Sequence, residues 1–203
     1  NGAGYYELTD YEVAAMLSYT YWATTPDASL MAKADAGELS SPAQISATLS
    51  SMLQDARAEK AFERFIEGWL DLDKDIKTAA ISDSLKADMK QESIEFVRRT
   101  VFGGGSYDQL LTADHSYMTQ QLAAHYGLVW PGGSDWQQVD YGTEGANAER
   151  RGVLGHAGIL AIQSASEKTH PVKRGLFVRR NLMCQDFPPP PMAQYLSHKK
   201  IQA

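Results

Sequence analysis

Apolar residues recur at helical spacing along most of the chain. The clearest stripe is Phe62, Phe65, Ile66, Trp69 and Leu70. It repeats at i, i+3, i+4, i+7 and i+8, which predicts the buried face of an amphipathic helix. Similar spacing between start and stop signals predicts further helices. Their approximate ranges are 5–23, 26–37, 42–55, 82–102, 106–111, 119–126, 153–163 and 171–183.

Local signals place several of the predicted helix starts. Thr9 and Glu12 form a capping-box pattern, in which each side chain satisfies a backbone N–H at the helix start. Ser41 stands directly before Pro42, an N-cap followed by proline at the first helical position. We expect Ser82 to cap the longest helix, with Val101 among its inward-facing residues.

Residues 128–149 are rich in glycine and show little periodicity. They predict a long loop with a brief strand pair around Trp136–Val139. Trp130 and Trp136 are expected either to anchor this loop on the core or to form a sugar-stacking platform. Pro188–Pro191 predicts a stiff C-terminal polyproline arm. Helices thus dominate, and we predict a mainly α, irregular multi-helix domain.

Composition narrows the class of protein. A chain of 203 residues suits one large domain or two small ones. The net charge of −6 argues against a general nucleic-acid binder. No run of 18 apolar residues is present, so we expect no membrane span. Cys184 is the only cysteine, which leaves a free thiol or pairing with another chain or segment.

Familiar site motifs are incomplete in this sequence. Asp71, Asp73 and Asp75 alternate as in a calcium loop, but Ile76 stands where that loop needs glycine. We therefore expect a solvated acidic turn and no metal site. No C-x-x-C-H is present, so no c-type haem is expected in this segment. A haem c elsewhere in the parent protein stays open.

The best candidate site lies in the stretch from residue 150 to 175. Arg151, His156, His170, Lys173 and Arg174 would converge if the two helices there packed antiparallel. Such a group would suit a carboxylate, a phosphate or an anionic sugar, because arginine offers a bidentate fork. The alternative is structural, with the arginines binding loop carbonyls and helix ends.

Two sets of short motifs carry a family resemblance. The first set is Leu8-Thr9, Ala15–Tyr19, Tyr21-Trp22, Pro26-Asp27 and Gly37–Leu39. The second set is Leu110–Asp114, Thr119–Gly127, Arg150–Leu154, His170–Gly175 and Pro188–Pro191. Together they resemble a tandem pair of domains of unknown function, numbers fifteen-ninety-two and fifteen-eighty-eight. Planctomycete-type and proteobacterial surface proteins contain this pair. His170 stands where the second family usually has serine.

The resemblance implies a place in a larger protein. Such chains are often fused to cytochrome c modules or carbohydrate-binding domains. We expect a first helical segment over 1–80, a second over 81–192 in one continuous core, and a tail over 193–203 towards a following domain. The expected location is exported: periplasmic, outer-membrane-associated or at the cell surface. The expected partners are other domains or chains of the parent protein, docking near Pro188–Pro191, and polysaccharide.

Two functional hypotheses follow. The first is a non-catalytic helical scaffold or interaction module of an exported, cytochrome-associated or polysaccharide-related multidomain protein. The alternative is an oxidative or carbohydrate-active enzyme domain with an anion-binding site around 150–175. No catalytic residue is assigned for either hypothesis.

Overall fold

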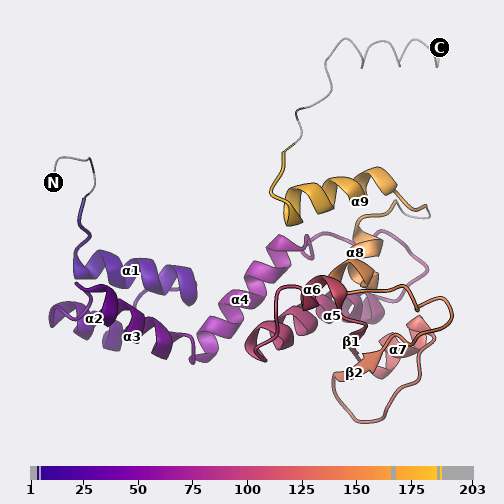
Figure 1. Cartoon of the computed structure of the whole chain (residues 1–203), viewed down its shortest axis with the longest axis horizontal. Helices are drawn as coiled ribbons and strands as arrows, with labels where there is room; N and C mark the ends of the chain where they lie inside the picture. Colours follow the sequence, from indigo (N-terminus) through magenta and orange to yellow (C-terminus); the bar gives the residue numbers. More distant parts are fainter. Residues whose placement is uncertain (1–3, 5, 166–167, 187, 189–203) are drawn as a thin grey trace.

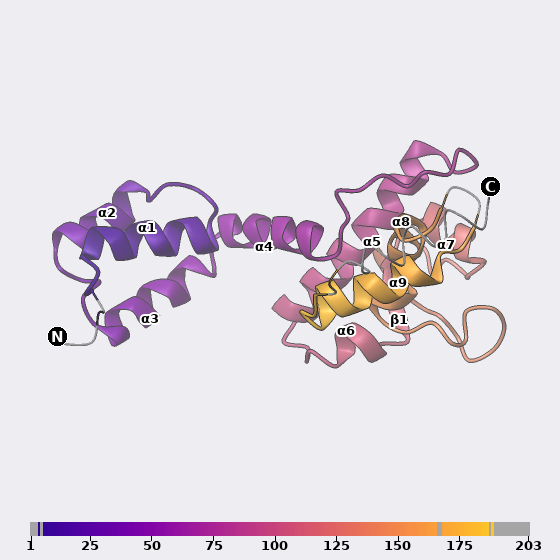
Figure 2. The same ribbon diagram turned by 90° about the horizontal axis from the view of Figure 1, so that it is seen from above.

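The computed structural model describes residue 4, residues 6–165, residues 168–186 and residue 188. Across these residues it is mainly helical, with nine α-helices and one small two-stranded sheet, as predicted. The helices form two lobes joined by the single helix α4, Ala56–Trp69 (Figures 1 and 2). Pro189–Pro191, most of the predicted proline arm, lie outside the described residues.

The first lobe consists of three helices with local caps. They are α1 (Asp10–Tyr21), α2 (Ala28–Asp35) and α3 (Pro42–Met52). The predicted capping box of Thr9 and Glu12 is confirmed, and Ser41 caps α3 through the backbone amide of Gln44. These caps satisfy amides that have no partner within the helix, so the helix starts follow from local sequence.

Helix α4 is anchored in the first lobe by Arg57. Its guanidinium pairs with Asp55 at 2.7 Å and with Asp27 at 2.9 Å, and it lies 3.5 Å from the ring centroid of Trp22. The hydrogen bonds from Arg57 hold the pKa of Asp55 down at about 2. The start of the connecting helix is therefore tied to α2 and to the end of α1.

The second lobe is built around α5, Asp83–Phe102. Six consecutive residues of α5, Glu92 to Val97, are buried, so neighbours surround the middle of this helix. The neighbours are the end of α4 and the short helices α6 (Gln109–Thr112), α7 (Gln120–Tyr126) and α8 (Ala157–Ile162). A further short helix, α9 (Pro171–Phe177), comes after α8 in the chain. A 3₁₀ turn, Val153–Gly155, precedes α8, and a π-helical turn, Val178–Leu182, follows α9.

The sheet pairs β1 (His115–Met118) with β2 (Gln137–Asp140) in antiparallel register, with His115 opposite Asp140. The strand predicted near residues 136–139 is confirmed as β2. Its partner β1 was not predicted, because four residues between two helix signals offer too short a pattern for strand periodicity.

Two glycines permit close packing in the second lobe. A Cβ on Gly158 would lie 2.3 Å from the carbonyl oxygen of Met89, so α8 lies directly against the backbone of α5. A Cβ on Gly152, which has a φ of +46°, would lie 2.1 Å from the carbonyl oxygen of Leu110. Both positions therefore require glycine for the observed helix approach.

The buried hydrophobic side chains form two clusters. One cluster lies among α1 to α3 and includes Ala58, and the other begins at Ile66 and fills the second lobe. The division at residues 80 and 81 stays a prediction. Within the described residues, no helix is both long and apolar enough to cross a membrane.

Two residues expected on buried helix faces are instead exposed. Phe65 is 58% exposed and Val101 44%. Phe65 lies on the connecting helix α4 and Val101 in the last turn of α5, and neither lobe covers them. The periodicity predicts the apolar face correctly but does not reveal that part of it has no partner.

Candidate functional site

The five basic residues predicted to form one anion site do not converge. Arg151 is exposed, and its guanidinium donates to the carbonyls of Ala148 at 2.9 Å and Arg150 at 2.6 Å. The Arg174 guanidinium donates to the carbonyl of Leu160 at 3.4 Å and to the Ser164 hydroxyl at 3.2 Å. Both arginines thus stabilise loops and helix ends, as the structural alternative predicts.

His156 is buried in the core of the second lobe. Its Nδ1 lies 2.9 Å from the Ser93 hydroxyl and its Nε2 lies 3.3 Å from the Ser116 hydroxyl. Its ring meets Phe96 edge-on, with centroids 5.0 Å apart. Burial, with a smaller contribution from the charge of Arg150, lowers the pKa of His156 to about 3. The imidazole is therefore neutral at physiological pH and unavailable to a ligand in solution.

His170 caps α9. Its Nδ1 accepts a hydrogen bond from the backbone amide of Lys173 at 3.3 Å. A serine hydroxyl performs the same task at many helix starts, so histidine can replace the serine expected here without loss of the cap. The unusual residue therefore has a structural explanation that requires no ligand.

Trp130 and Trp136 are both half-buried and pack against the core of the second lobe. No ring contact joins them among the described residues. This arrangement favours the role of loop anchors over that of a flat sugar-stacking platform.

A buried polar network surrounds Glu92 in the middle of α5. The Tyr126 hydroxyl donates to Glu92 Oε2 at 2.7 Å and accepts from the backbone amide of Ala157 at 2.6 Å. The Arg150 guanidinium lies 4.7 Å from the ring centroid of Tyr126. Neither Glu92 Oε1 nor the Tyr141 hydroxyl has a hydrogen-bond partner in the described part of the chain.

The network holds two groups with raised pKa values. Burial raises the pKa of Glu92 to about 7, and the hydrogen bond from Tyr126 offsets part of this rise. Burial and the nearby Glu92 carboxylate raise the pKa of Tyr141 well above its usual value. Shifted carboxyl groups often mark active sites, but Glu92 has no exposed surface. The network therefore has no route to a substrate in this conformation.

The sequence contained an unused signal for this network. Glu92 lies three residues after Met89 and four before Phe96, on the apolar stripe of α5. A carboxylate on a buried stripe requires a polar partner in the core. That partner, Tyr126, could not be identified from spacing, because 34 residues separate it from Glu92.

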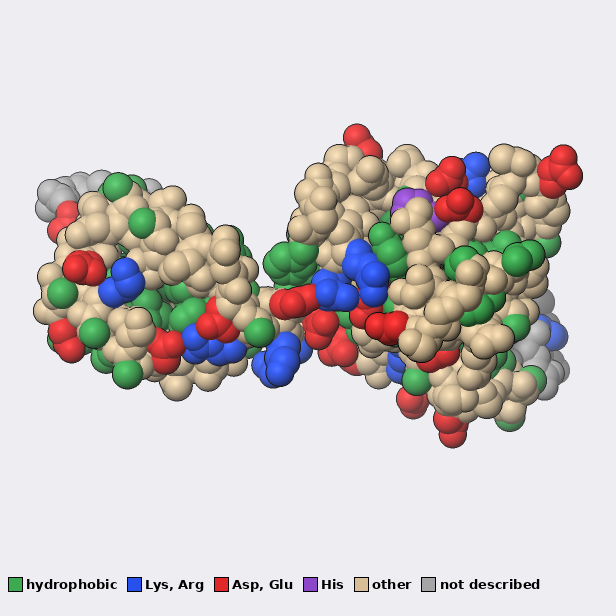
Figure 3. Space-filling model, turned by 90° about the horizontal axis from the view of Figure 1, so that it is seen from below, with side chains coloured by type: hydrophobic (Ala, Val, Ile, Leu, Met, Phe, Trp, Pro, Cys, Tyr) green, Lys and Arg blue, Asp and Glu red, His purple; other side chains and the backbone are tan. Residues whose placement is uncertain are grey.

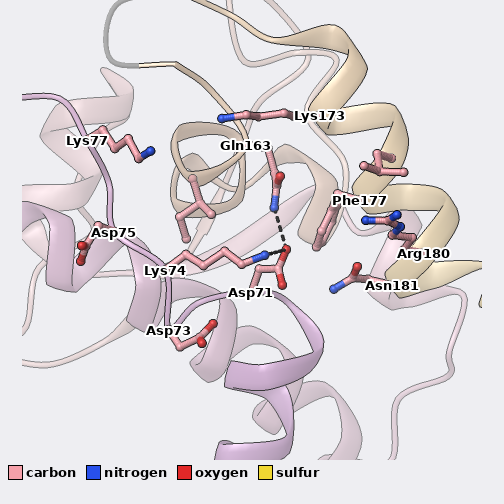
Figure 4. Close-up of a pocket in the computed structure, with 12 residues that line it drawn as sticks. Asp71, Asp73, Lys74, Asp75, Lys77, Gln163, Lys173, Phe177, Arg180 and Asn181 are labelled. Atoms are coloured by element: carbon pink, nitrogen blue, oxygen red, sulfur yellow. Dashed lines mark hydrogen bonds and ion pairs between the residues drawn. The ribbon is translucent and has the colours of Figure 1, made fainter. Parts of the chain in front are cut away.

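A pocket of about 670 Å³ lies between the segment that follows α4 and the pair α8 and α9 (Figure 4). Asp71 lies at its centre and has a φ of +60°. The Asp71 carboxylate accepts from Lys74 Nζ at 2.7 Å and from Gln163 Nε2 at 3.0 Å. Reciprocal bonds between Trp69 and Asn181, at 2.6 and 2.7 Å, join the two walls.

Several charged side chains of this pocket are unpaired. Asp73, Asp75, Lys77 and Lys173 line the pocket, and none has an ion-pair partner among the described residues. The ammonium ends of Lys77 and Lys173 are directed towards one another across the opening (Figure 4). Of the five residues of the predicted anion site, Lys173 is the one that lines this pocket.

A second pocket of about 580 Å³ shares Asp75 and Lys77 with the first and continues along α5 to Lys86 and Lys90. We call the two adjoining pockets the lysine groove. Lys86 pairs with Asp83 at 3.0 Å, whereas Lys90 has no side-chain partner in the described residues. No group of three metal-ligating side chains is present in the part of the chain that the structure describes.

A different surface feature lies where the lobes meet. Phe62, Phe65 and Trp69 of α4 form a ladder with ring centroids 5.9 Å apart at each step, and Phe102 of α5 meets Phe62 edge-on at 5.5 Å. We call these four residues the aromatic strip. Phe65 and Phe102 are 58% and 48% exposed. Hydrophobic and charged side chains lie together at this junction (Figure 3).

Charged residues hold α4 against α5 beside the strip. Arg98 pairs with Glu59 on α4 and, at 2.7 Å, with Glu95 on its own helix. Glu95 also accepts from Arg99 Nε at 2.8 Å. The Arg98–Glu59 pair thus joins α5 to α4 beside the strip.

Comparison with protein families gives two matches in tandem. The model of PSD4, a protein of unknown function (DUF1592), matches residues 8–128, more than half of the chain. The model of PSCyt3, a protein of unknown function (DUF1588), matches residues 150–202. The motifs at 110–114 and 119–127 thus fall within the first match. Searches of curated proteins and of solved structures found no match.

Proposed function

The chain belongs to the PSD4 family of proteins of unknown function (DUF1592), with a PSCyt3 segment (DUF1588) in tandem, and on this basis we propose that it is a non-catalytic helical interaction module of a multidomain protein. The module would position other domains of that protein through its surface. It performs no chemistry in this proposal.

The observation that supports the proposal is the aromatic strip. Burying a phenylalanine side chain is worth roughly 1.5–3 kcal/mol, and Phe65 and Phe102 forgo about half of this gain while they face water. Contiguous exposed apolar side chains with a charged surround are typical of protein interaction sites. Arg98 and its glutamate partners supply that charged surround.

We propose that the occupant of the strip is another domain or chain of the same exported parent protein. The name PSCyt3 hints at an association with cytochromes. A haem c would then reside in the parent protein outside this segment, because the segment lacks a C-x-x-C-H motif. A cell-surface or periplasmic location suits such an assembly.

Docking can be tested in the parent protein by removing the strip. The double substitution Phe65→Ser with Phe102→Ser should release the module, and small-angle X-ray scattering should report a larger radius of gyration. Val129→Ser is the control, because Val129 is 89% exposed and lies outside the strip. An unchanged radius in the double variant would show that the strip holds no partner.

The lysine groove favours a second candidate function, a carbohydrate-active or oxidative enzyme domain with its anion site near residues 150–175. Lys173 supplies the link, because it belongs to that stretch and faces the pocket. Incubation of the parent protein with acidic oligosaccharides, followed by mass spectrometry of the products, tests this candidate. Products of altered mass that disappear in Lys173→Gln would favour the enzyme over the non-catalytic module.

A further inference from the structure

We infer that the lysine groove binds an acidic oligosaccharide, a chain of sugars that carries carboxylate groups at intervals. The inference goes beyond the proposed docking function and concerns a different surface of the chain. It does not depend on docking at the aromatic strip, so either can fail alone.

The cationic side chains of the groove match a ligand with repeated negative charges. Lys173 lies at one end, Lys77 between the two pockets and Lys90 in the second pocket. None of the three ammonium groups has an ion-pair or hydrogen-bond partner in the described residues, so binding a carboxylate would break no existing pair. Three separated charges suit a chain better than a single small anion.

The remaining polar groups match sugar hydroxyls. Asp73 and Asp75 have no partner in the described part and can accept hydrogen bonds from hydroxyl donors. Asn181 uses its amide nitrogen on the Trp69 carbonyl, which leaves its side-chain oxygen as a further acceptor. Carboxylates beside lysines suit a ligand whose sugars each carry hydroxyl groups as well as a carboxylate.

These features disfavour a nucleic acid. The chain has a net charge of −6, which opposes a phosphate on every nucleotide. Single strands also require exposed rings on which bases stack. The aromatic residue that lines the groove, Phe177, is only 4% exposed.

The walls of the groove are fixed before any ligand arrives. Lys74 and Gln163 hold Asp71, and the Trp69–Asn181 pair joins the loop after α4 to the turn after α9. A preformed site lowers the entropy lost on binding. The first pocket should therefore keep its shape when lysines on its rim are replaced.

Isothermal titration of the parent protein with a tetramer of galacturonic acid tests the inference. We expect binding that weakens with added salt. The double variant Lys77→Gln with Lys173→Gln should bind about tenfold more weakly, since two exposed ion pairs of about 0.7 kcal/mol each are lost. The control Lys33→Gln with Lys60→Gln removes the same charge from positions outside the groove and should bind normally.

Three outcomes would overturn the inference: equal binding of the methyl-esterified tetramer, equal loss in the control variant, or tighter binding of a single-stranded DNA of matched charge. Amide chemical shifts of the wild-type protein provide a measurement that needs no variant. The tetramer should move the amides of residues 71–77 and 173–181, and shifts confined to other regions would contradict the assigned site.

Discussion

Replacement of Glu92 by glutamine should make the stability of the protein respond to pH in a characteristic way. Burial raises the pKa of Glu92 from 4.5 to about 7. Below pH 4.5 the carboxyl group is protonated in the folded and the unfolded state. Between pH 4.5 and 7 the unfolded chain ionises first, so the wild-type protein loses stability as the pH rises through this window.

The size of the effect follows from the pKa difference. Each unit corresponds to 1.36 kcal/mol, so the wild-type protein should lose up to about 3 kcal/mol across the window. The glutamine side chain of Glu92→Gln cannot ionise, and its oxygen can still accept from the Tyr126 hydroxyl. The variant should therefore gain up to about 3 kcal/mol relative to wild type between pH 4.5 and pH 8.

Urea unfolding at pH values across this window measures the effect, with tryptophan fluorescence reporting the second lobe through Trp69, Trp130 and Trp136. Subtracting the stability of wild type from that of the variant removes the contributions of all other titrating groups.

The substitution His156→Asn should give the opposite dependence of stability on pH. Burial lowers the pKa of His156 from 6.5 to about 3, so wild-type stability falls on acidification below 6.5 and the variant escapes that loss. A constant difference between Glu92→Gln and wild type at all pH values would refute the account of this network.

Two further substitutions test the packing of the second lobe. Gly158→Ala should destabilise this lobe by roughly 1–3 kcal/mol, because the new Cβ would clash with the Met89 carbonyl oxygen. Gly175→Ala is the control: no atom lies within 4 Å of its Cβ, so this variant should be neutral or slightly stabilising. Thermal unfolding measures both variants. Trp69→Phe removes the indole N–H that donates to the Asn181 carbonyl and should lower the stability by about 1 kcal/mol. Amide hydrogen exchange at the turn after α9 should become faster. Unchanged exchange would show that this bond does not hold the pocket wall.

Much of the fold was predictable because its signals are local. Thr9 with Glu12 and Ser41 with Pro42 set helix starts through neighbouring atoms, and both are confirmed. The strand β1 and the two separate cores depend on contacts between distant segments, which periodicity does not encode. Phe65 illustrates the limit: its spacing marks an apolar face, yet only the spatial arrangement shows that the face is uncovered.

The candidate site was less predictable for the same reason. Arg151, His156 and His170 are close in sequence, yet one binds loop carbonyls, one is sealed in the core and one caps a helix. Lys173 faces a pocket whose opposite wall, around residue 71, lies about a hundred residues away in the chain. Residue type alone predicted an anionic ligand, whereas the position of Lys173 at a pocket required the structure.

On the proposed function, the aromatic strip is an interface inside a larger protein. Hydroxyl-radical footprinting of Phe65 and Phe102, read by mass spectrometry, tests it most directly when the parent protein is compared with the isolated 203-residue chain. We predict strong protection of both side chains in the parent protein and ready oxidation in the isolated chain, with Val129 oxidised equally in both. Equal oxidation of Phe65 and Phe102 in the two proteins would contradict the claim.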